Sequence, residues 1–326
     1  MKYAKIGGQA VIEGVMMRYG NDYAVTVRKP DGTLEVKKDT YESLVSRLHL
    51  TRVPILRGVF AFIDSMVLGI STLTYSASFY EDEETETDKG AAPEAAASEK
   101  SGSSLGEKLI MGVTVALSLV IAIGLFMVLP FLISDLFSHV TDSSWLLGII
   151  EGIVRVILFM AYIVLISRMK DIQRVFMYHG AEHKSINCIE HGALLTPENA
   201  MKYSRFHKRC GTSFLFIVIF LSIVFFILFF QIFPVENMAL KVVIRILLVP
   251  VIAGVAYEII QWAGRSEGRF ADVISRPGMA LQKLTTREPD ESMIEAAIAS
   301  IEAIYDWKAF QEEVRAGEQS DVKTAS

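Results

Sequence analysis

Long apolar runs fill much of the chain beyond residue 107. Four of them approach or exceed the roughly 20 residues that a helix needs to cross a bilayer. They cover residues 109–133, 146–167, 212–233 and 242–262. The first and third contain no charged side chain, and the other two contain two each. The pattern predicts a mainly α protein, a polytopic membrane helix bundle whose four spans form a transmembrane domain over residues 107–262.

The segment 54–80 is also long enough to span a bilayer, but Arg57 and Asp64 interrupt it and it is rich in Ser and Thr. If it crossed the membrane, the basic loop at residues 168–211 would move to the outer side. We therefore predict an amphipathic helix that lies in the membrane interface or re-enters the membrane from one side.

Residues 1–53 have the pattern of a small α+β region outside the membrane. Apolar and polar residues alternate over residues 23–38 on both sides of a Pro-Asp-Gly turn, which predicts a β-hairpin. The preceding stretch, IGGQAVIEGVMMRYG, is rich in glycine and lacks phosphate-loop or dinucleotide-binding spacing, so we interpret it as a turn-rich cap. Its single acid, Glu13, could be carried by these turns to a site elsewhere.

The remaining segments are polar. Residues 81–106 are acidic and rich in Ala, Pro, Gly and Ser, a composition that predicts a disordered linker. Residues 263–315 form a C-terminal region outside the membrane with one amphipathic helix. Its apolar positions are 294, 298, 301 and 304, after an N-cap candidate at Asp290. Residues 316–326 are predicted to be a disordered tail.

Basic residues are concentrated in one loop, which predicts the orientation. Residues 168–211 contain eight Lys and Arg, whereas residues 134–145 contain none and residues 234–241 contain one. By the positive-inside rule the basic loop and both termini are cytosolic, in a multi-pass protein of the cell membrane.

Composition agrees with this assignment, because 52% of residues are hydrophobic and only 21% are charged. A net charge of −5 argues against nucleic acid as a partner. The N-terminus lacks the pattern of a cleavable signal peptide, so the first span is expected to direct insertion. Both cysteines fall on the predicted cytosolic side, where thiols stay reduced, and no disulfide is expected.

The strongest chemical signal is the string YHGAEHKSINCIEHG at residues 178–192. His179, Glu182 and His183 form an H-x-x-E-H array, in which a helix would project both histidines from one face. Such a pair supplies two imidazole ligands for zinc, and Glu182 is placed to act as general base. The same string marks the inverzincin metallopeptidases, in which a downstream glutamate completes the site.

Several residues are candidates for the remaining metal ligands. Glu258 in the last span has an order and spacing similar to the inverzincin glutamate. Glu190 follows His183 by seven residues and shares its helix face. His207 and Cys210, three residues apart before the third long run, would suit zinc. His191 is interpreted as a helix-end residue.

Two alternatives to a metal site remain. The basic loop could be an interfacial helix whose cations hold lipid phosphates. The charges inside the spans could instead serve another role: Glu151 and Arg155 are spaced to form an ion pair, which Arg245 could join.

Four motifs resemble, in order, those of the YqhQ-like family of bacterial membrane proteins: GGQAVIEGVMMR, YHGAEHK, RCGTSF and QKLTTREPD. The resemblance runs from end to end apart from the linker and the tail. It implies membrane location and a metal-dependent enzyme, but no particular reaction. It also marks as motif positions His179, Glu182, His183, His207, Cys210 and Glu258.

We therefore expect a membrane-embedded, zinc-dependent hydrolase with its site at the cytosolic membrane face, acting on a lipid-linked or membrane-protein substrate in contact with membrane lipids. One alternative is a non-catalytic scaffold or regulator with structural histidines. Another is a small transporter built on the charges inside the spans, for which a homo-oligomer would provide a larger pathway.

Overall fold

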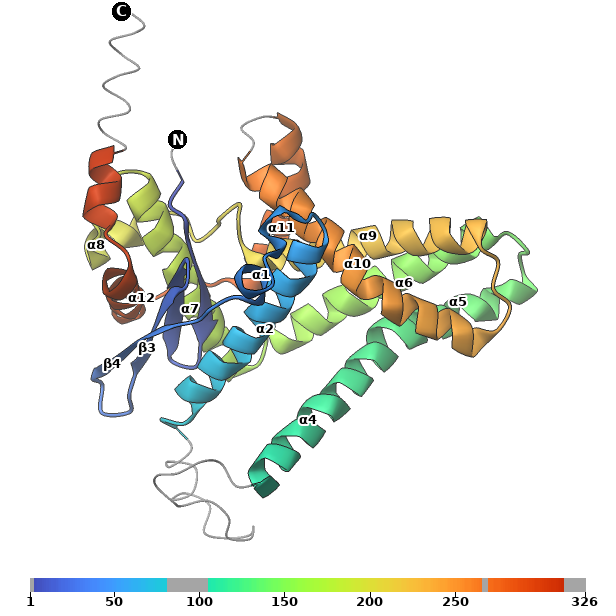
Figure 1. The fold of residues 1–326 in the computed structure, drawn as a ribbon, viewed down its shortest axis with the longest axis horizontal. Coiled ribbons are helices and arrows are strands. Elements are labelled where there is room, and N and C mark those ends of the chain that lie inside the picture. The colour runs from blue at the N-terminus through green and yellow to red at the C-terminus, as the bar shows by residue number, and fades with distance from the viewer. Residues whose placement is uncertain (1–2, 81–104, 266–268, 314–326) are drawn as a thin grey trace, which may run out of the picture. The chain divides into compact units, whose positions relative to one another are not determined.

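The computed structural model describes residues 3–80, 105–265 and 269–313. The predicted tail and nearly all of the predicted linker lie outside these residues. The described chain is mainly helical with one small sheet (Figure 1). It divides into two compact units. Unit 1 comprises residues 1–83, 163–217 and 253–326, and unit 2 comprises residues 84–162 and 218–252.

Unit 1 is built on an antiparallel sheet with strand order β1-β2-β3-β4. The strands are β1 (Ile6–Val11), β2 (Gly14–Tyr19), β3 (Asp22–Arg28) and β4 (Leu34–Thr40). The hairpin predicted around Asp31 is confirmed: β3 pairs with β4, and the Asp31 carboxylate accepts the backbone N–H of Thr33 at 2.8 Å. The glycine-rich stretch interpreted as a cap is in fact a second hairpin, β1 and β2. Its tight turn at Ile12 and Glu13 has no Asn-Gly signal, and its glycines disfavour a strand prediction.

Successive side chains of a strand point to opposite sides, so the sheet presents side chains on both faces. Both faces are covered by helices. On one face Val15, Met17 and Ala24 pack with residues of α7 (Lys170–Glu190) and α12 (Glu291–Ile304). On the other face Met16 and Val25 pack with residues that include Leu68 of α2 (Leu56–Ala77). Figure 1 shows α2 and α7 on either side of the strands. The sheet therefore forms the centre of a layered α+β unit.

The C-terminal helix starts where the sequence indicated. The Asp290 side chain accepts the backbone N–H of Met293 at 3.0 Å and so caps the first turn of α12. The apolar positions Ile294, Ile301 and Ile304 are buried against the sheet and α7. The remaining elements of unit 1 among the described residues include three short ones, α1 (Leu44–Arg47), η1 (Leu50–Arg52) and α8 (Pro197–Met201), and the longer helix α11 (Arg269–Thr285).

Five helices among the described residues are long and apolar enough to cross a membrane, one more than predicted. These candidate spans are Leu56–Ala77, Gly112–His139, Ser144–Ile166, Gly211–Ile232 and Met238–Ala263. The first corresponds to α2. The second combines α4 (Leu105–Ile123), η2 (Gly124–Val128), α5 (Leu129–Asp135) and η3 (Leu136–His139). The other three correspond to α6 (Ser144–Ile166), α9 (Gly211–Ile232) and α10 (Met238–Arg265).

The additional candidate is α2, whose two charged residues are both paired within unit 1. Arg57 forms an ion pair with Glu258, and buried Asp64 accepts the backbone N–H of Leu44 at 2.9 Å and the hydroxyl of Tyr41 at 3.0 Å. The rest of the helix is apolar enough to meet the criteria for a span. The sequence therefore identified the apolar helices, but the predicted count of four is one short of the candidates.

Candidate metal centre

Two histidines lie on one face of α7. His179 and His183 are four residues apart, so they project from the same side of the helix about one turn apart. Their ring centroids are 4.4 Å apart. The helix is buried continuously from Gly180 to Glu190, so His183 lies in the protein interior and the half-buried His179 lies at its edge. Ordinary helix geometry is enough to bring the two imidazoles together.

Backbone carbonyls orient both rings. Nδ1 of His179 lies 2.9 Å from the carbonyl oxygen of Thr285, and Nδ1 of His183 lies 2.7 Å from that of Arg205. A carbonyl can only accept, so each Nδ1–H donates, and in the neutral form of each ring Nε2 keeps its lone pair. Burial also lowers the pKa of His183, which favours a neutral ring. Such carbonyl contacts are the usual outer support of histidines that bind metals.

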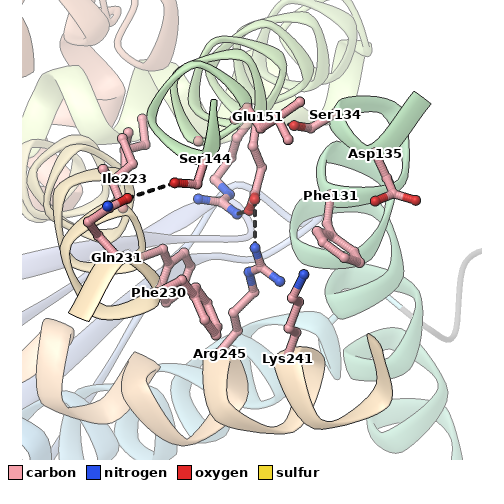
Figure 2. Close-up of a pocket in the computed structure, with 15 residues that line it drawn as sticks. Phe131, Ser134, Asp135, Ser144, Glu151, Ile223, Phe230, Gln231, Lys241 and Arg245 are labelled. Carbon is pink, nitrogen blue, oxygen red and sulfur yellow. Dashed lines mark hydrogen bonds and ion pairs between the residues drawn. The ribbon is translucent and has the colours of Figure 1, made fainter. Parts of the chain in front are cut away.

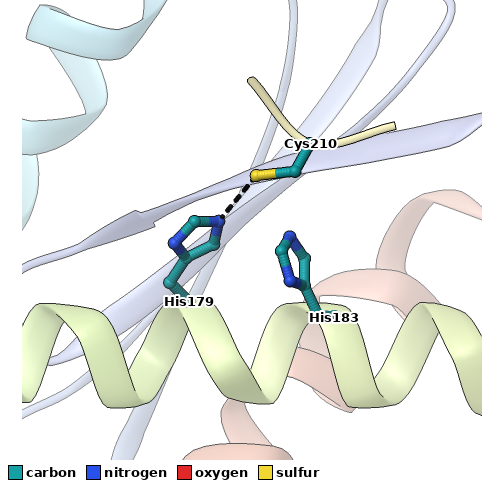
Figure 3. Close-up of side chains that lie close together, drawn as sticks. All are labelled: His179, His183 and Cys210. Atoms are coloured by element: carbon teal, nitrogen blue, oxygen red, sulfur yellow. Dashed lines mark hydrogen bonds between the residues drawn. The ribbon is translucent and has the colours of Figure 1, made fainter. Parts of the chain in front are cut away.

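Cys210 lies next to the two imidazole rings. Its Sγ atom lies 3.1 Å from Nε2 of His179 and accepts the backbone N–H of Thr212 at 3.4 Å. The ligand atoms of His179, His183 and Cys210 all lie within 4.8 Å of one another. Figure 3 shows the two rings rising from α7 toward the sulfur. No second group of three such ligand residues occurs in the described part of the chain.

Two imidazole nitrogens and one cysteine sulfur are a donor set that suits zinc. Their separations are close to those that one shared ion requires, with Zn–N about 2.0 Å and Zn–S about 2.3 Å. A zinc ion with three protein ligands keeps a fourth position for water or substrate, as in catalytic sites. The residues present therefore fit a zinc ion of the catalytic kind.

Glu182 lies beside these ligands in the interior. It is 5% exposed, and the backbone N–H of Gly8 in β1 donates a hydrogen bond to its carboxylate. Burial raises the pKa of Glu182, while the positive charge that His179 has when protonated and the bond from Gly8 lower this pKa. A buried carboxylate beside such a group of ligand residues is suited to take a proton from water.

The position of Glu182 depends on glycine in β1. A Cβ atom at Gly8 would lie 2.6 Å from the carbonyl oxygen of Met16, 2.7 Å from Sδ of Met17 and 3.0 Å from Cδ of Glu182. At Gly7 a Cβ atom would meet nothing within 4 Å. The two adjacent glycines therefore differ sharply in the space available to a side chain.

We expect the Gly8→Ala variant to be destabilised by about 1–3 kcal/mol, because the added methyl group overpacks the space between β2 and α7. The Gly7→Ala variant is the matched control and should change stability by less than about 0.5 kcal/mol. Thermal unfolding in detergent measures both. Equal midpoints for the two variants would contradict the packing argument.

The three ligand residues and Glu182 line one cavity of about 450 Å³. Its walls come from β1, α7 and the segment 207–212, which includes Thr212 of α9. Ser65 of α2 also lines it. The cavity is therefore bordered by two of the helices that are long and apolar enough to cross a membrane.

The structure places Glu190 and His207 in a neighbouring ion-pair network instead of the ligand group. Glu190 is 4% exposed; one oxygen pairs with Arg209 and accepts the backbone N–H of Ala4 at 2.9 Å. Its other oxygen lies 3.3 Å from Nε2 of His207. The His207 ring remains near the centre, with its centroid 5.6 Å from that of His183. This network connects the segment just before β1 to the segment that carries Cys210.

Glu258 is engaged elsewhere in unit 1. Its carboxylate makes a two-point ion pair with Arg57 and does not line the cavity of the ligand group. The inverzincin spacing therefore does not bring this glutamate to the histidines here. His191 is the C-terminal cap of α7, as interpreted from the sequence.

The carbonyl groups of Thr285 and Arg205 contact the histidines but were not identified from the sequence, because any residue type can supply a carbonyl. Gly180 was also missed. A Cβ atom there would lie 2.0 Å from the carbonyl oxygen of Arg287, so only glycine lets this segment pack on α7. Glu13, considered as a site residue, instead pairs with Arg174 and lies 3.3 Å from the hydroxyl of Tyr178.

Comparisons with known proteins agree with the resemblance seen in the motifs. Residues 53–307 match the model of a protein family described as "Protein of unknown function (DUF1385)". The chain is similar to the uncharacterized protein YqhQ of Bacillus subtilis (strain 168), with 32% identity over 313 residues that cover 94% of each chain. No solved structure matches it. The chain therefore belongs to the DUF1385 family.

Proposed function

We propose that the protein is a membrane-bound, zinc-dependent hydrolase. The observation that carries the proposal is the convergence of His179, His183 and Cys210, with both Nδ1 atoms bound to backbone carbonyls and Nε2 of His179 lying 3.1 Å from the sulfur of Cys210. In this assignment these three residues are the zinc ligands. A structural ion pair or a lipid-binding helix would not require this choice of tautomer at two adjacent histidines.

The chemistry follows from the donor set and its surroundings. A bound zinc ion would supply a Lewis acid and an activated water at its open position. Glu182 is the residue that would take up a proton from the attacking water and return it to the leaving group. The carbonyls of Thr285 and Arg205 hold the imidazoles in place, and the backbone N–H of Gly8 holds Glu182.

The substrate class follows from what borders the cavity. Ser65 belongs to α2, whose buried positions are small or polar apart from Leu68. Its exposed side carries large apolar residues, Ile63, Met66, Val67, Ile70 and Leu73. Such a helix is suited to lie in the membrane interface beside the cavity. The proposed substrate is therefore a lipid-linked molecule or a membrane protein.

The orientation is proposed on the distribution of basic residues. The segment 168–211 contains α7 and Cys210 and holds eight Lys and Arg, so unit 1 and both termini face the cytosol of a cell-membrane protein. A cysteine introduced at Lys308 on the C-terminal side should react with a membrane-impermeant maleimide only after cell lysis. Labelling in intact cells would contradict this orientation and indicate the opposite one.

Metal analysis tests the proposal directly. Protein purified without a His-tag should retain stoichiometric zinc, and cobalt exchanged into it should give thiolate-to-metal charge-transfer absorption. Absence of both would refute the zinc assignment and would favour a non-catalytic scaffold whose histidines are structural.

A further inference from the structure

Unit 2 contains a buried cluster of charges that the proposed metal chemistry does not use. Glu151 and Arg155 of α6 and Arg245 of α10 are 6%, 5% and 4% exposed. Each oxygen of Glu151 accepts from one guanidinium at 2.6 Å, Oε1 from Arg155 and Oε2 from Arg245. Two buried cations thus share one carboxylate, and an excess positive charge is left in the interior of an apolar helix group.

The excess charge is localised on Arg245. Arg155 is fully engaged, because its Nε donates to the carbonyl of Phe126 at 3.0 Å and its Nη1 lies 3.4 Å from the hydroxyl of Ser222. Arg245 uses only Nη2. Its Nε and Nη1 atoms are buried without a hydrogen-bond partner. Buried guanidinium N–H groups without an acceptor are costly, so this side chain is prepared to donate to a group that is not part of the chain.

A cavity lies at this guanidinium. It has a volume of about 120 Å³ and is lined by Arg245, Glu151, Arg155, Asp135 and Lys241 among other residues. Three cations therefore face two carboxylates, which leaves one net positive charge. The space exceeds the roughly 10–15 Å³ that one water needs, so it can accept a group larger than a water molecule.

The walls of the cavity strengthen its attraction for an anion. The Arg245 guanidinium lies 4.5 Å from the ring centroid of Phe131 and 4.8 Å from that of Phe230. In Figure 2 these rings flank Arg245, while Lys241 lies beside it on α10. Aromatic faces stabilise the cation but accept no strong hydrogen bond, and they exclude the water that would screen its charge.

We propose that this cavity binds an oxyanion group, a phosphate or carboxylate, on Arg245. The planar guanidinium presents two unused donor nitrogens, the arrangement that matches oxyanions. Lys241 adds a second cation at the same cavity, and Gln231 and Ser144, 2.7 Å apart, supply polar groups. The oxyanion is either a free small anion or the phosphate of a lipid headgroup. The site is independent of the proposed zinc centre.

The test uses the full chain in a neutral detergent. Inorganic phosphate or acetate should raise its unfolding temperature, and Arg245→Gln should weaken that binding by about 10-fold or more, because a charged hydrogen-bond donor is lost. Glu151→Gln should have the opposite effect and tighten binding, because it removes a competing carboxylate. Lys170→Gln, an exposed cation of unit 1, is the control and should leave the response unchanged.

A lipid source is tested by mass spectrometry of the phospholipids that copurify with the protein. Anionic phospholipid retained by the unaltered chain and lost in Arg245→Gln would assign the oxyanion to a headgroup. A response to phosphate or acetate without retained lipid would assign it to a free anion. If the unaltered chain neither responds to these anions nor retains anionic lipid, the proposal is overturned, whether or not the two variants fold.

Discussion

Replacement of Glu182 by Gln should lower turnover by about 10²–10⁴-fold while the zinc content stays unchanged. General base catalysis typically contributes this factor, and Gln has the same shape but cannot take up a proton from water. Its amide oxygen still accepts the N–H of Gly8, so the packing against β1 is preserved. In the measurement, purified protein is incubated with membranes from cells that lack it. The lipids and peptides that each variant releases are then quantified by mass spectrometry.

The matched control is Glu198→Gln, an exposed acid in the first turn of α8. It should keep both zinc and turnover. Because Glu182→Gln binds substrate without converting it, the uncleaved molecule should also accumulate in cells that carry this variant. Full turnover in Glu182→Gln with zinc retained would exclude this carboxylate as the base. Loss of zinc together with turnover would instead mean that Glu182 supports the ligand group.

Local pattern was enough to predict the parts of the fold that depend on neighbouring residues. The apolar runs became long helices, the alternation around Asp31 became β3 and β4, and Asp290 capped α12. The four-residue spacing of His179 and His183 likewise placed both rings on one helical face. These features arise from the periodicity of a helix or strand, which the sequence carries directly.

Other features depend on packing between distant segments, and the sequence did not resolve them. Glu258 and Cys210 were both reasonable partners for the histidines, but Arg57 pairs with Glu258 in the fold. The first hairpin was missed because Gly7 and Gly8 weaken the strand pattern. In the structure Gly8 is needed where β1 approaches Glu182. A glycine that looks like a turn residue can thus mark close packing inside a strand.

Zinc affinity should fall by more than about 100-fold when Cys210 is replaced by Ser or His183 by Asn. Loss of an outer partner of a metal ligand already costs about 10–100-fold, and loss of a ligand should cost more. His179→Asn should behave in the same way, because the three ligand atoms lie within 4.8 Å of one another. Competition with a chromophoric chelator measures the affinities, and cobalt absorption reports whether sulfur still binds.

Two other residues of the same region separate ligand loss from general damage. Cys188→Ala removes the other buried cysteine, which lies on α7, and His191→Asn changes the residue that caps this helix, so both should keep full zinc affinity. His207→Asn removes a partner of Glu190 and should lower the unfolding temperature with zinc still bound. If His207→Asn lost zinc as completely as Cys210→Ser, His207 would be a ligand, and the open position required for hydrolysis would be filled by the protein itself.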